Sequence, residues 1–155
     1  MGDHTEAIQI DFDPNQISYE EIIDMVWEAH NPTFPAWSRQ YMSAIWYENE
    51  AQREIIEAAK EAQARHYSQE IKTPILPLET FYRAEDYHQK YSLQKYRALM
   101  KPFHAMYPNF EGFVDSTAAA RLNGFVSSRG TVEQLKEEVD GYGIPLETLK
   151  SVLRF

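Results

Sequence analysis

The sequence predicts a mixed α/β fold of the α+β type, because strand-like and helix-like segments share one chain of 155 residues. Residues 2–13, 41–47 and 73–78 have the short apolar or aromatic runs that are typical of strands. Residues 18–29 and 49–67 have helix caps followed by apolar residues at helical spacing. A hydrophobic content of 43% is enough for a core, and the length suits one domain with an appendage.

The first predicted strand carries a candidate proton donor. It ends at Pro14, since proline cannot donate to a sheet ladder. Side chains alternate between the two faces of a strand, so Glu6 begins the face that holds Ile8, Ile10 and Phe12. A carboxylate at the mouth of an apolar face is poorly hydrated, which favours its protonated form near neutral pH. The alternative is that Glu6 lies at a solvated strand end, as most strand-end carboxylates do.

Capping residues define the two predicted helices of this region. Ser18 and Glu21 have the spacing of a capping box, and Asn31-Pro32 ends the helix. Asn49 is placed to cap the second helix. Between the helices, the strand at residues 41–47 is rich in aromatic residues. The segment at 73–78 contains prolines and is therefore expected at a sheet edge.

The C-terminal third is predicted to be helical. We expect a helix over residues 84–100, a loop over 102–112, and short helices near 116–123, 131–140 and 145–153. The predicted domains are 1–101 and a helical extension, 102–155, that packs on the core. The alternative for the extension is a partner-binding helix. Glu85 and His88 share a helix face, but two ligands are a weak metal signal, and no metal is expected.

Composition excludes several classes of protein. A formal net charge of −9 argues against binding to a phosphate backbone, so no nucleic-acid partner is expected. The absence of cysteine excludes disulfides and thiol-based metal sites. No apolar run is long enough to span a bilayer, and the acidic N-terminus does not resemble a signal peptide. A cytoplasmic location without a membrane partner is the default expectation.

Several motifs occur in a recognisable order. They are Gly2-Asp3-His4-Thr5-Glu6, Trp27-Glu28-Ala29-His30-Asn31-Pro32-Thr33, Gln40-Tyr41-Met42-Ser43-Ala44-Ile45, and Phe81-Tyr82-Arg83-Ala84-Glu85-Asp86-Tyr87-His88-Gln89-Lys90-Tyr91. Over residues 2–95 the chain resembles the methionine sulfoxide reductase A family, the peptide-methionine (S)-S-oxide reductases. The resemblance implies reduction of methionine S-sulfoxide, free or in proteins, as a repair of oxidative damage.

The resemblance also implies a fold and a missing part. The family fold is a ferredoxin-like two-layer sandwich, and its first strand and helix have no counterpart here, so we expect an N-terminally truncated version with a helical C-terminal appendage. The family's nucleophilic cysteine lies in a Gly-Cys-Phe-Trp-type motif upstream of the Gly2–Glu6 match. The chain has no cysteine and is therefore expected to be a fragment of a longer enzyme, inactive alone.

Site residues follow from the same resemblance. Glu6 is expected to protonate the departing sulfoxide oxygen, and Tyr41 to donate a hydrogen bond to it, since a phenol presents an O–H on a rigid ring. His4 is expected to bind substrate. Trp37 is expected to hold the substrate methyl group, with Phe34 and Trp46 as alternatives, although no motif match assigns this role. No bound cofactor is implied, but thioredoxin or another thiol reductant is. An aspartate of the family is replaced here by Ala36. The alternative function is that of a non-catalytic binding or interaction protein of the same fold.

Overall fold

A computed structural model gives the structure of residues 4–153. Contacts divide the protein into two compact units, the N-terminal unit (Met1–Phe81) and the helical unit (Tyr82–Phe155). Helices and a small parallel sheet occur together, so the predicted α+β class is confirmed. The sequence placed a domain boundary between residues 101 and 102, a point that lies inside helix α4 (Arg97–Met106).

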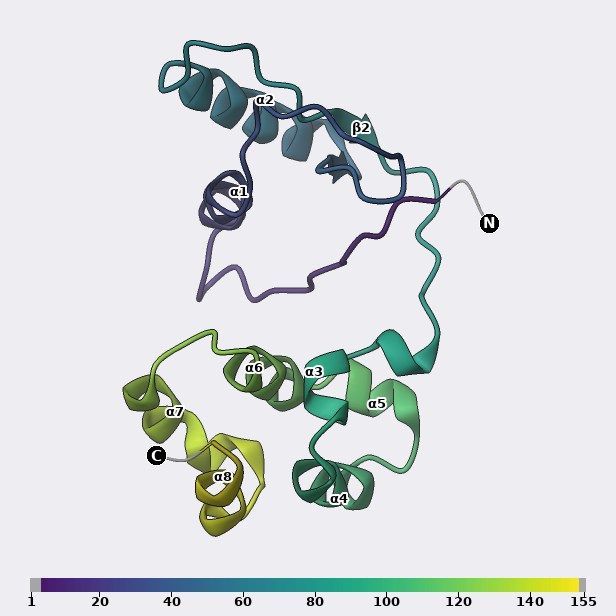
Figure 1. Ribbon diagram of the computed structural model, residues 1–155, viewed down its shortest axis with the longest axis vertical. Coiled ribbons are helices and arrows are strands. Elements are labelled where there is room, and N and C mark those ends of the chain that lie inside the picture. Colours follow the sequence, from purple (N-terminus) through teal and green to yellow (C-terminus); the bar gives the residue numbers. More distant parts are fainter. Residues whose placement is uncertain (1–3, 154–155) are drawn as a thin grey trace. The chain divides into compact units, whose positions relative to one another are not determined.

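The N-terminal unit packs two helices with a two-stranded parallel sheet. Its elements are α1 (Tyr19–Glu28), β1 (Ile45–Tyr47), α2 (Glu50–Ala64) and β2 (Ile75–Pro77). Figure 1 shows α2 lying beside the strand pair of this unit. Ile45 pairs with Ile75 and Tyr47 pairs with Pro77. The core of the unit consists of Ile23, Trp27, Ile45, Ile56 and Ile71.

The predicted caps of this unit are confirmed. The Ser18 side chain accepts from the backbone N–H of Glu21, and a Glu21 carboxylate oxygen accepts from the Ser18 N–H at 2.8 Å. These hydrogen bonds stabilise the charged form and lower the pKa of Glu21. Asn49 caps α2 by accepting from the Gln52 N–H at 3.0 Å. Local sequence determines both helix starts.

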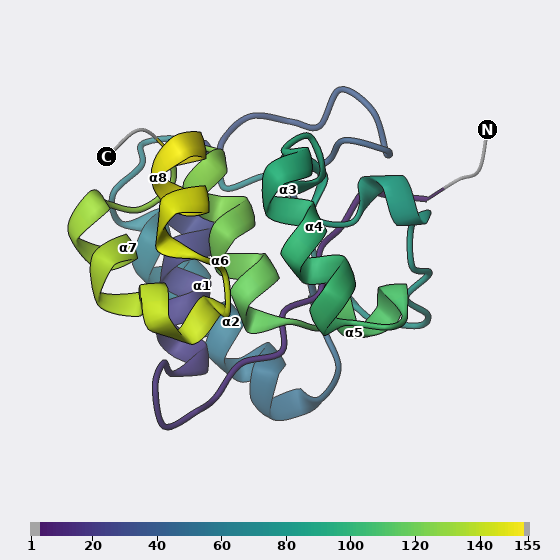
Figure 2. The ribbon, with the colours of Figure 1, turned by 90° about the horizontal axis from the view of Figure 1, so that it is seen from below.

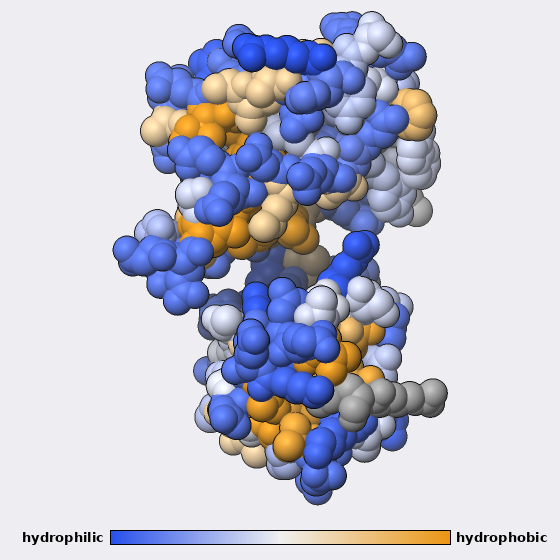
Figure 3. All heavy atoms as spheres, turned by 90° about the vertical axis from the view of Figure 1, so that its left-hand side faces the viewer, coloured by the Kyte–Doolittle hydropathy of each residue, from blue (hydrophilic) through white to orange (hydrophobic). Residues whose placement is uncertain are grey.

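The predicted first strand is wrong for the part of it that the structure describes, since residues 4–13 form no regular secondary structure. One backbone hydrogen bond ties this segment to a distant part of the chain, from Glu6 N to Gln40 O. A strand needs a continuous ladder to a neighbour, which alternating side chains alone do not supply. The predicted apolar face is accordingly exposed, with Ile8 at 83% and Ile10 at 53%. Figure 3 shows that hydrophobic residues interrupt the hydrophilic surface of the molecule.

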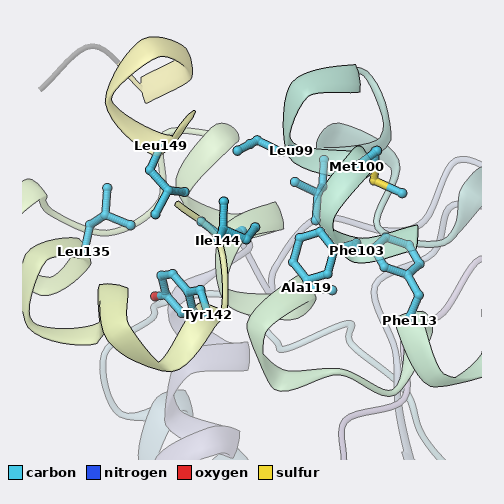
Figure 4. Close-up of a cluster of buried hydrophobic side chains, with 11 residues drawn as sticks. Leu99, Met100, Phe103, Phe113, Ala119, Leu135, Tyr142, Ile144 and Leu149 are labelled. Atoms are coloured by element: carbon cyan, nitrogen blue, oxygen red, sulfur yellow. The ribbon is translucent and has the colours of Figure 1, made fainter. Parts of the chain in front are cut away.

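The helical unit is built from short helices around a core of its own. Its elements are η1 (Asp86–His88) and η2 (Val139–Tyr142), which are 3₁₀-helices, and α3 (Tyr91–Gln94), α4, α5 (Phe110–Val114), α6 (Thr117–Val126), α7 (Val132–Glu138) and α8 (Leu146–Leu153). α3 packs on α6, and α4 packs on both α3 and α8 (Figure 2). The completely buried side chains include Leu93, Leu99, Phe103, Leu122 and Leu149, and Figure 4 shows Phe103 facing Phe113.

The long helix predicted over residues 84–100 is wrong, because the chain interrupts it at residues 89–90 and again at residues 95–96. The first interruption has a clear structural cause. Gln89 is extended, and Lys90 adopts the left-handed conformation with φ of 49°. The Gln94 side chain stabilises the break by donating to the carbonyls of Asp86 and Gln89. The break separates η1 from α3. Burial of Leu93 in the common core overrides the helical pattern of the sequence.

The loop predicted over residues 102–112 is also wrong, since Pro102 lies inside α4 and α5 follows. Proline removes one helical hydrogen bond, to the carbonyl of Ala98. Ala98 is exposed, and an exposed helix carbonyl can bond to water instead. Burial of Leu99 and Phe103 on either side of the proline holds the helix together. The remaining helices agree with the sequence, including the capping box of Thr131 and Gln134.

Among residues 4–153, no helix combines the length and the apolar character that crossing a membrane requires.

Candidate functional site

Glu6 is attached at two points to the chain segment that precedes Tyr41. The Glu6 N–H donates to the Gln40 carbonyl at 2.8 Å, and the Gln40 side-chain Nε2 donates to Glu6 Oε1 at 2.9 Å. The neighbouring Thr5 hydroxyl donates to the Arg39 carbonyl at 2.9 Å. These bonds fix both the backbone and the carboxylate of Glu6. They bring together two motifs that lie 34 positions apart in the sequence.

Tyr41 and Trp37 form a stacked aromatic pair. Their ring centroids are 5.1 Å apart and the rings are inclined by 22°. The Tyr41 N–H donates to the Ser38 hydroxyl at 3.3 Å, which closes the turn that brings the rings together. Both rings are accessible, with Tyr41 48% and Trp37 79% exposed. The Tyr41 ring is therefore packed on one side and open on the other.

A surface hollow of about 280 Å³ opens beside this pair. We call it the aromatic hollow. Its walls include three aromatic rings and several polar side chains: Phe34, Trp37, Tyr41, His30, Ser43 and Lys72. Ala36 is also in the lining. Apolar rings beside a few convergent polar groups are the usual lining of a small-molecule site.

His30 joins the wall of the hollow to α1 and to the segment that precedes β2. Its Nδ1 lies 2.8 Å from the Val26 carbonyl, and its Nε2 lies 2.8 Å from the Thr73 hydroxyl. Because the carbonyl can only accept, Nδ1 carries the proton and donates to it. In that tautomer Nε2 accepts from Thr73. The Trp27 ring stacks on the imidazole at 5.8 Å. Both ring nitrogens are thus engaged, and His30 positions the wall.

Lys72 lines the hollow and pairs with an acidic residue outside the lining. Its backbone N–H donates to the Pro32 carbonyl at 2.7 Å. Its Nζ forms an ion pair with Glu70, and this contact lowers the pKa of Glu70, first through the hydrogen bond and then through charge. Lys60 donates from Nζ to the Thr73 carbonyl at 3.4 Å and adds positive charge to the same region.

The predicted site residues differ in their surroundings. Tyr41 and Trp37 line the hollow, and Glu6 is bonded to the residue next to Tyr41. Glu6 is exposed, so the poorly hydrated setting predicted for it is wrong, and the solvated alternative agrees with the structure. His4 is exposed and lies two residues before Glu6.

Three further residues were not singled out from the sequence: Gln40, His30 and Lys72. Gln40 and His30 lie inside quoted motifs, which offered a signal. No local pattern connects Lys72 with residues 30–43, because only the folded chain brings them together.

A metal site is not evident among residues 4–153, where no three metal-binding side chains gather. Glu85 and His88 approach one another instead, with Nε2 and Oε2 at 3.8 Å.

The sequence of the chain matches a known protein family and several of its members. The sequence model of the family described as peptide methionine sulfoxide reductase matches residues 1–118. The chain belongs to this family. The match includes every predicted site residue of the N-terminal unit and extends into the helical unit.

Individual relatives differ in how far they match. A peptide methionine sulfoxide reductase of Drosophila melanogaster is 40% identical over 147 residues, covering 93% of this chain and 58% of the relative. Relatives of Methanosarcina acetivorans and Streptococcus pyogenes, both called peptide methionine sulfoxide reductase MsrA, are 40% and 44% identical over 99 and 94 residues. These two matches cover 59% and 56% of the chain. The chain therefore spans little more than half the length of these relatives, and the fly protein shares most of the helical unit.

Proposed function

We propose that this chain supplies the proton donor and the substrate-binding surface of a peptide-methionine (S)-S-oxide reductase. The observation that carries the proposal is the attachment of Glu6 to Gln40, next to Tyr41 at the aromatic hollow. The family match over residues 1–118 includes all of these residues. Methionine S-sulfoxide, free or in proteins, is the proposed substrate.

The proposed roles follow from the groups at the hollow. The apolar rings of Trp37 and Phe34 receive the methyl group of the substrate, because burial of a methyl against aromatic carbon removes it from water. The Tyr41 hydroxyl donates to the sulfoxide oxygen. Glu6 delivers a proton to the same oxygen as it leaves sulfur. Gln40 holds the Glu6 carboxylate in place. His4, near the acid in sequence, is proposed to contact substrate.

The reaction requires a thiolate, and this chain has no cysteine. In the proposed step, a cysteine thiolate from sequence outside this chain attacks the sulfoxide sulfur and forms a bond between the two sulfurs. The S–O bond breaks, and the oxygen leaves as water after taking two protons, one of them from Glu6. A water molecule then attacks the cysteine sulfur, which breaks the S–S bond, releases methionine and a proton, and leaves the cysteine as a sulfenic acid. The cysteine sulfur loses two electrons, and the methionine sulfur gains them. Two thiols of thioredoxin or another reductant then form a disulfide, releasing water and regenerating the cysteine.

The proposal includes the architecture and location of the complete enzyme. A parallel strand pair with α2 packed along it is compatible with a ferredoxin-like two-layer sandwich, which is the proposed fold. A cytoplasmic location is proposed because that compartment keeps thiols reduced.

The test uses the endogenous protein, isolated from its native extract and weighed intact. We expect a mass above 18.1 kDa, a cysteine-bearing extension, and turnover of the S but not the R sulfoxide epimer with dithiothreitol. Glu6→Gln is expected to reduce turnover about 10²-fold or more, the usual share of a general acid. Glu85→Gln, at another exposed carboxylate, is the control. A Glu6→Gln enzyme with unchanged turnover would exclude Glu6 as the acid.

A second candidate is a non-catalytic protein that binds oxidised methionine. The absence of cysteine from the chain and Ala36 in place of the aspartate favour it. In that case the endogenous protein has a mass of 18.1 kDa, binds the sulfoxide and releases no methionine. The same preparation therefore distinguishes the two functions.

A further inference from the structure

The size of the aromatic hollow limits what it can hold. Pockets for drug-sized ligands measure about 300–1,000 Å³, and this hollow measures about 280 Å³. It therefore suits a ligand of one amino acid. The three rings provide an apolar wall for a methionine side chain, and the polar groups of the lining remain for whatever the side chain is attached to.

Lys72 is the lysine in the lining of this hollow, and its backbone is held firmly. Its N–H is bonded to Pro32, and its neighbours Ile71 and Thr73 are buried at 7% and 3% exposure. The start of the side chain is therefore fixed, and the side chain as a whole is 45% exposed, with its ammonium paired to Glu70. A cation with these properties can meet an anionic group of a ligand without rearrangement of the backbone.

Glu70 is the present partner of Lys72 and a weak competitor for it. The side chains of Lys72 and Glu70 are 45% and 78% exposed, so water screens their attraction. A ligand carboxylate can replace Glu70 without burying an unpaired charge, because the displaced Glu70 remains in water. Lys60, bonded to the Thr73 carbonyl, adds to the positive potential that such a carboxylate meets.

We infer that Lys72 binds the carboxylate of a methionine sulfoxide whose own carboxyl group is free, so that the hollow prefers this substrate class to residues within a chain. The inference rests on the proposed function and narrows its substrate. Two sources share this chemistry, namely the free amino acid and the last residue of a peptide. An internal methionine sulfoxide has an amide there, which carries no charge for Lys72.

The test compares three ligands on the 155-residue chain. They are methionine S-sulfoxide, its N-acetyl derivative, and the N-acetyl methylamide, which represent the free amino acid, a C-terminal residue and an internal residue. Binding is followed by NMR titration of the indole N–H signals, since Trp37 lines the hollow. We expect the N-acetyl derivative to bind about fivefold more tightly than its methylamide, the upper range for a partly exposed ion pair. Stronger binding of the free amino acid than of the N-acetyl derivative would identify the free amino acid as the source. Equal or weaker binding would identify the peptide C-terminus.

Variants of the ion pair provide the decisive contrast. Lys72→Met is expected to abolish the preference for a carboxylate, and Glu70→Gln to increase it by freeing Lys72. Lys150→Met is the matched control, because the Lys150 side chain is 44% exposed, close to the 45% of Lys72, and pairs with Glu147 but is not in the lining. A folded Lys72→Met chain that keeps the full preference would overturn the inference.

Failure of the inference and failure of the proposed function give different results. Equal binding of the N-acetyl derivative and the methylamide overturns the role of Lys72 and leaves the sulfoxide site intact. Binding of none of the three ligands overturns the proposed function together with this inference.

Discussion

The two units have similar lengths but unequal cores. Among residues 4–153, the helical unit buries eleven residues in one hydrophobic cluster, whereas the N-terminal unit buries five. Several large apolar side chains of the N-terminal unit are more than two thirds exposed, among them Ile8, Phe34 and Trp37. The region that carries the family's acid and aromatic motifs is therefore the less densely packed one. We infer that the helical unit is the more stable of the two and that binding residues are concentrated where packing is thin.

The largest expected effect comes from the core of the helical unit. Phe103 is completely buried and packs edge-on against Phe113 at 5.4 Å. Phe103→Ala should cost about 3–5 kcal/mol of unfolding free energy, because it leaves a cavity. Denaturation followed by circular dichroism measures the loss. Tyr87→Ala, at a 61% exposed ring, is the control and should change stability by less than about 0.5 kcal/mol.

The corresponding change in the N-terminal unit tests whether the cores are independent. Ile56 is completely buried in α2, so Ile56→Ala should cost about 2–5 kcal/mol. All three tryptophans lie in this unit, so their fluorescence reports its unfolding alone. We expect Ile56→Ala to shift the fluorescence transition and Phe103→Ala to leave it in place. Equal shifts from both variants would show that the units unfold as one.

A smaller effect is expected at the glycines around η2. Gly143 has φ of +63°, and a Cβ there would lie 2.7 Å from the Met106 Sδ. Gly143→Ala should cost about 1–2 kcal/mol, the strain of the left-handed conformation, while the flexible Met106 moves aside. Gly141 has nothing within 4 Å of an added Cβ. Gly141→Ala should therefore be close to neutral, and two similar melting curves would contradict this account.

The smallest expected effect is a loss of stability at the two capping boxes, which should differ in its dependence on pH. Ser18→Ala and Thr131→Ala should each cost about 1 kcal/mol. Only the first box contains a carboxylate. Because folding lowers the pKa of Glu21, its contribution is present above the ordinary glutamate pKa of about 4.3 and is lost as pH falls through the lowered value. Gln134 does not titrate, so acidification should reduce the Ser18→Ala effect and leave the Thr131→Ala effect unchanged in matched melts.

The same contrast explains what the sequence could predict. Caps at Ser18, Asn49 and Thr131 depend on residues three positions away, so local pattern was sufficient. The strand predicted over residues 2–13 would have needed a neighbouring strand to pair with. The alternation of apolar and polar side chains does not show whether such a neighbour exists. The break at Lys90 and the helical Pro102 depended on a shared core that local propensity does not contain.

For the site, the family resemblance predicted the roles of Glu6 and Tyr41. Only the folded structure shows that Glu6 is bonded to Gln40, the residue next to Tyr41. The Glu6–Gln40 bonds and the approach of Lys72 to residues 30–43 join segments far apart in sequence. Neither can be derived from spacing. The exposure of Glu6 also depended on whether the apolar face found a partner, which the sequence did not decide.

The pairing of Ile45 with Ile75 has a consequence for the speed of folding. This parallel pair forms only after the intervening chain, including α2, has closed a loop, and such closure is entropically unfavourable before the contacts are made. The helical unit consists of short helices, whose backbone hydrogen bonds are local and form faster than contacts that need a closed loop. In refolding from denaturant, the circular dichroism signal should therefore recover ahead of the tryptophan fluorescence. During that interval the aromatic side chains of the N-terminal unit have not yet assembled into a ligand site.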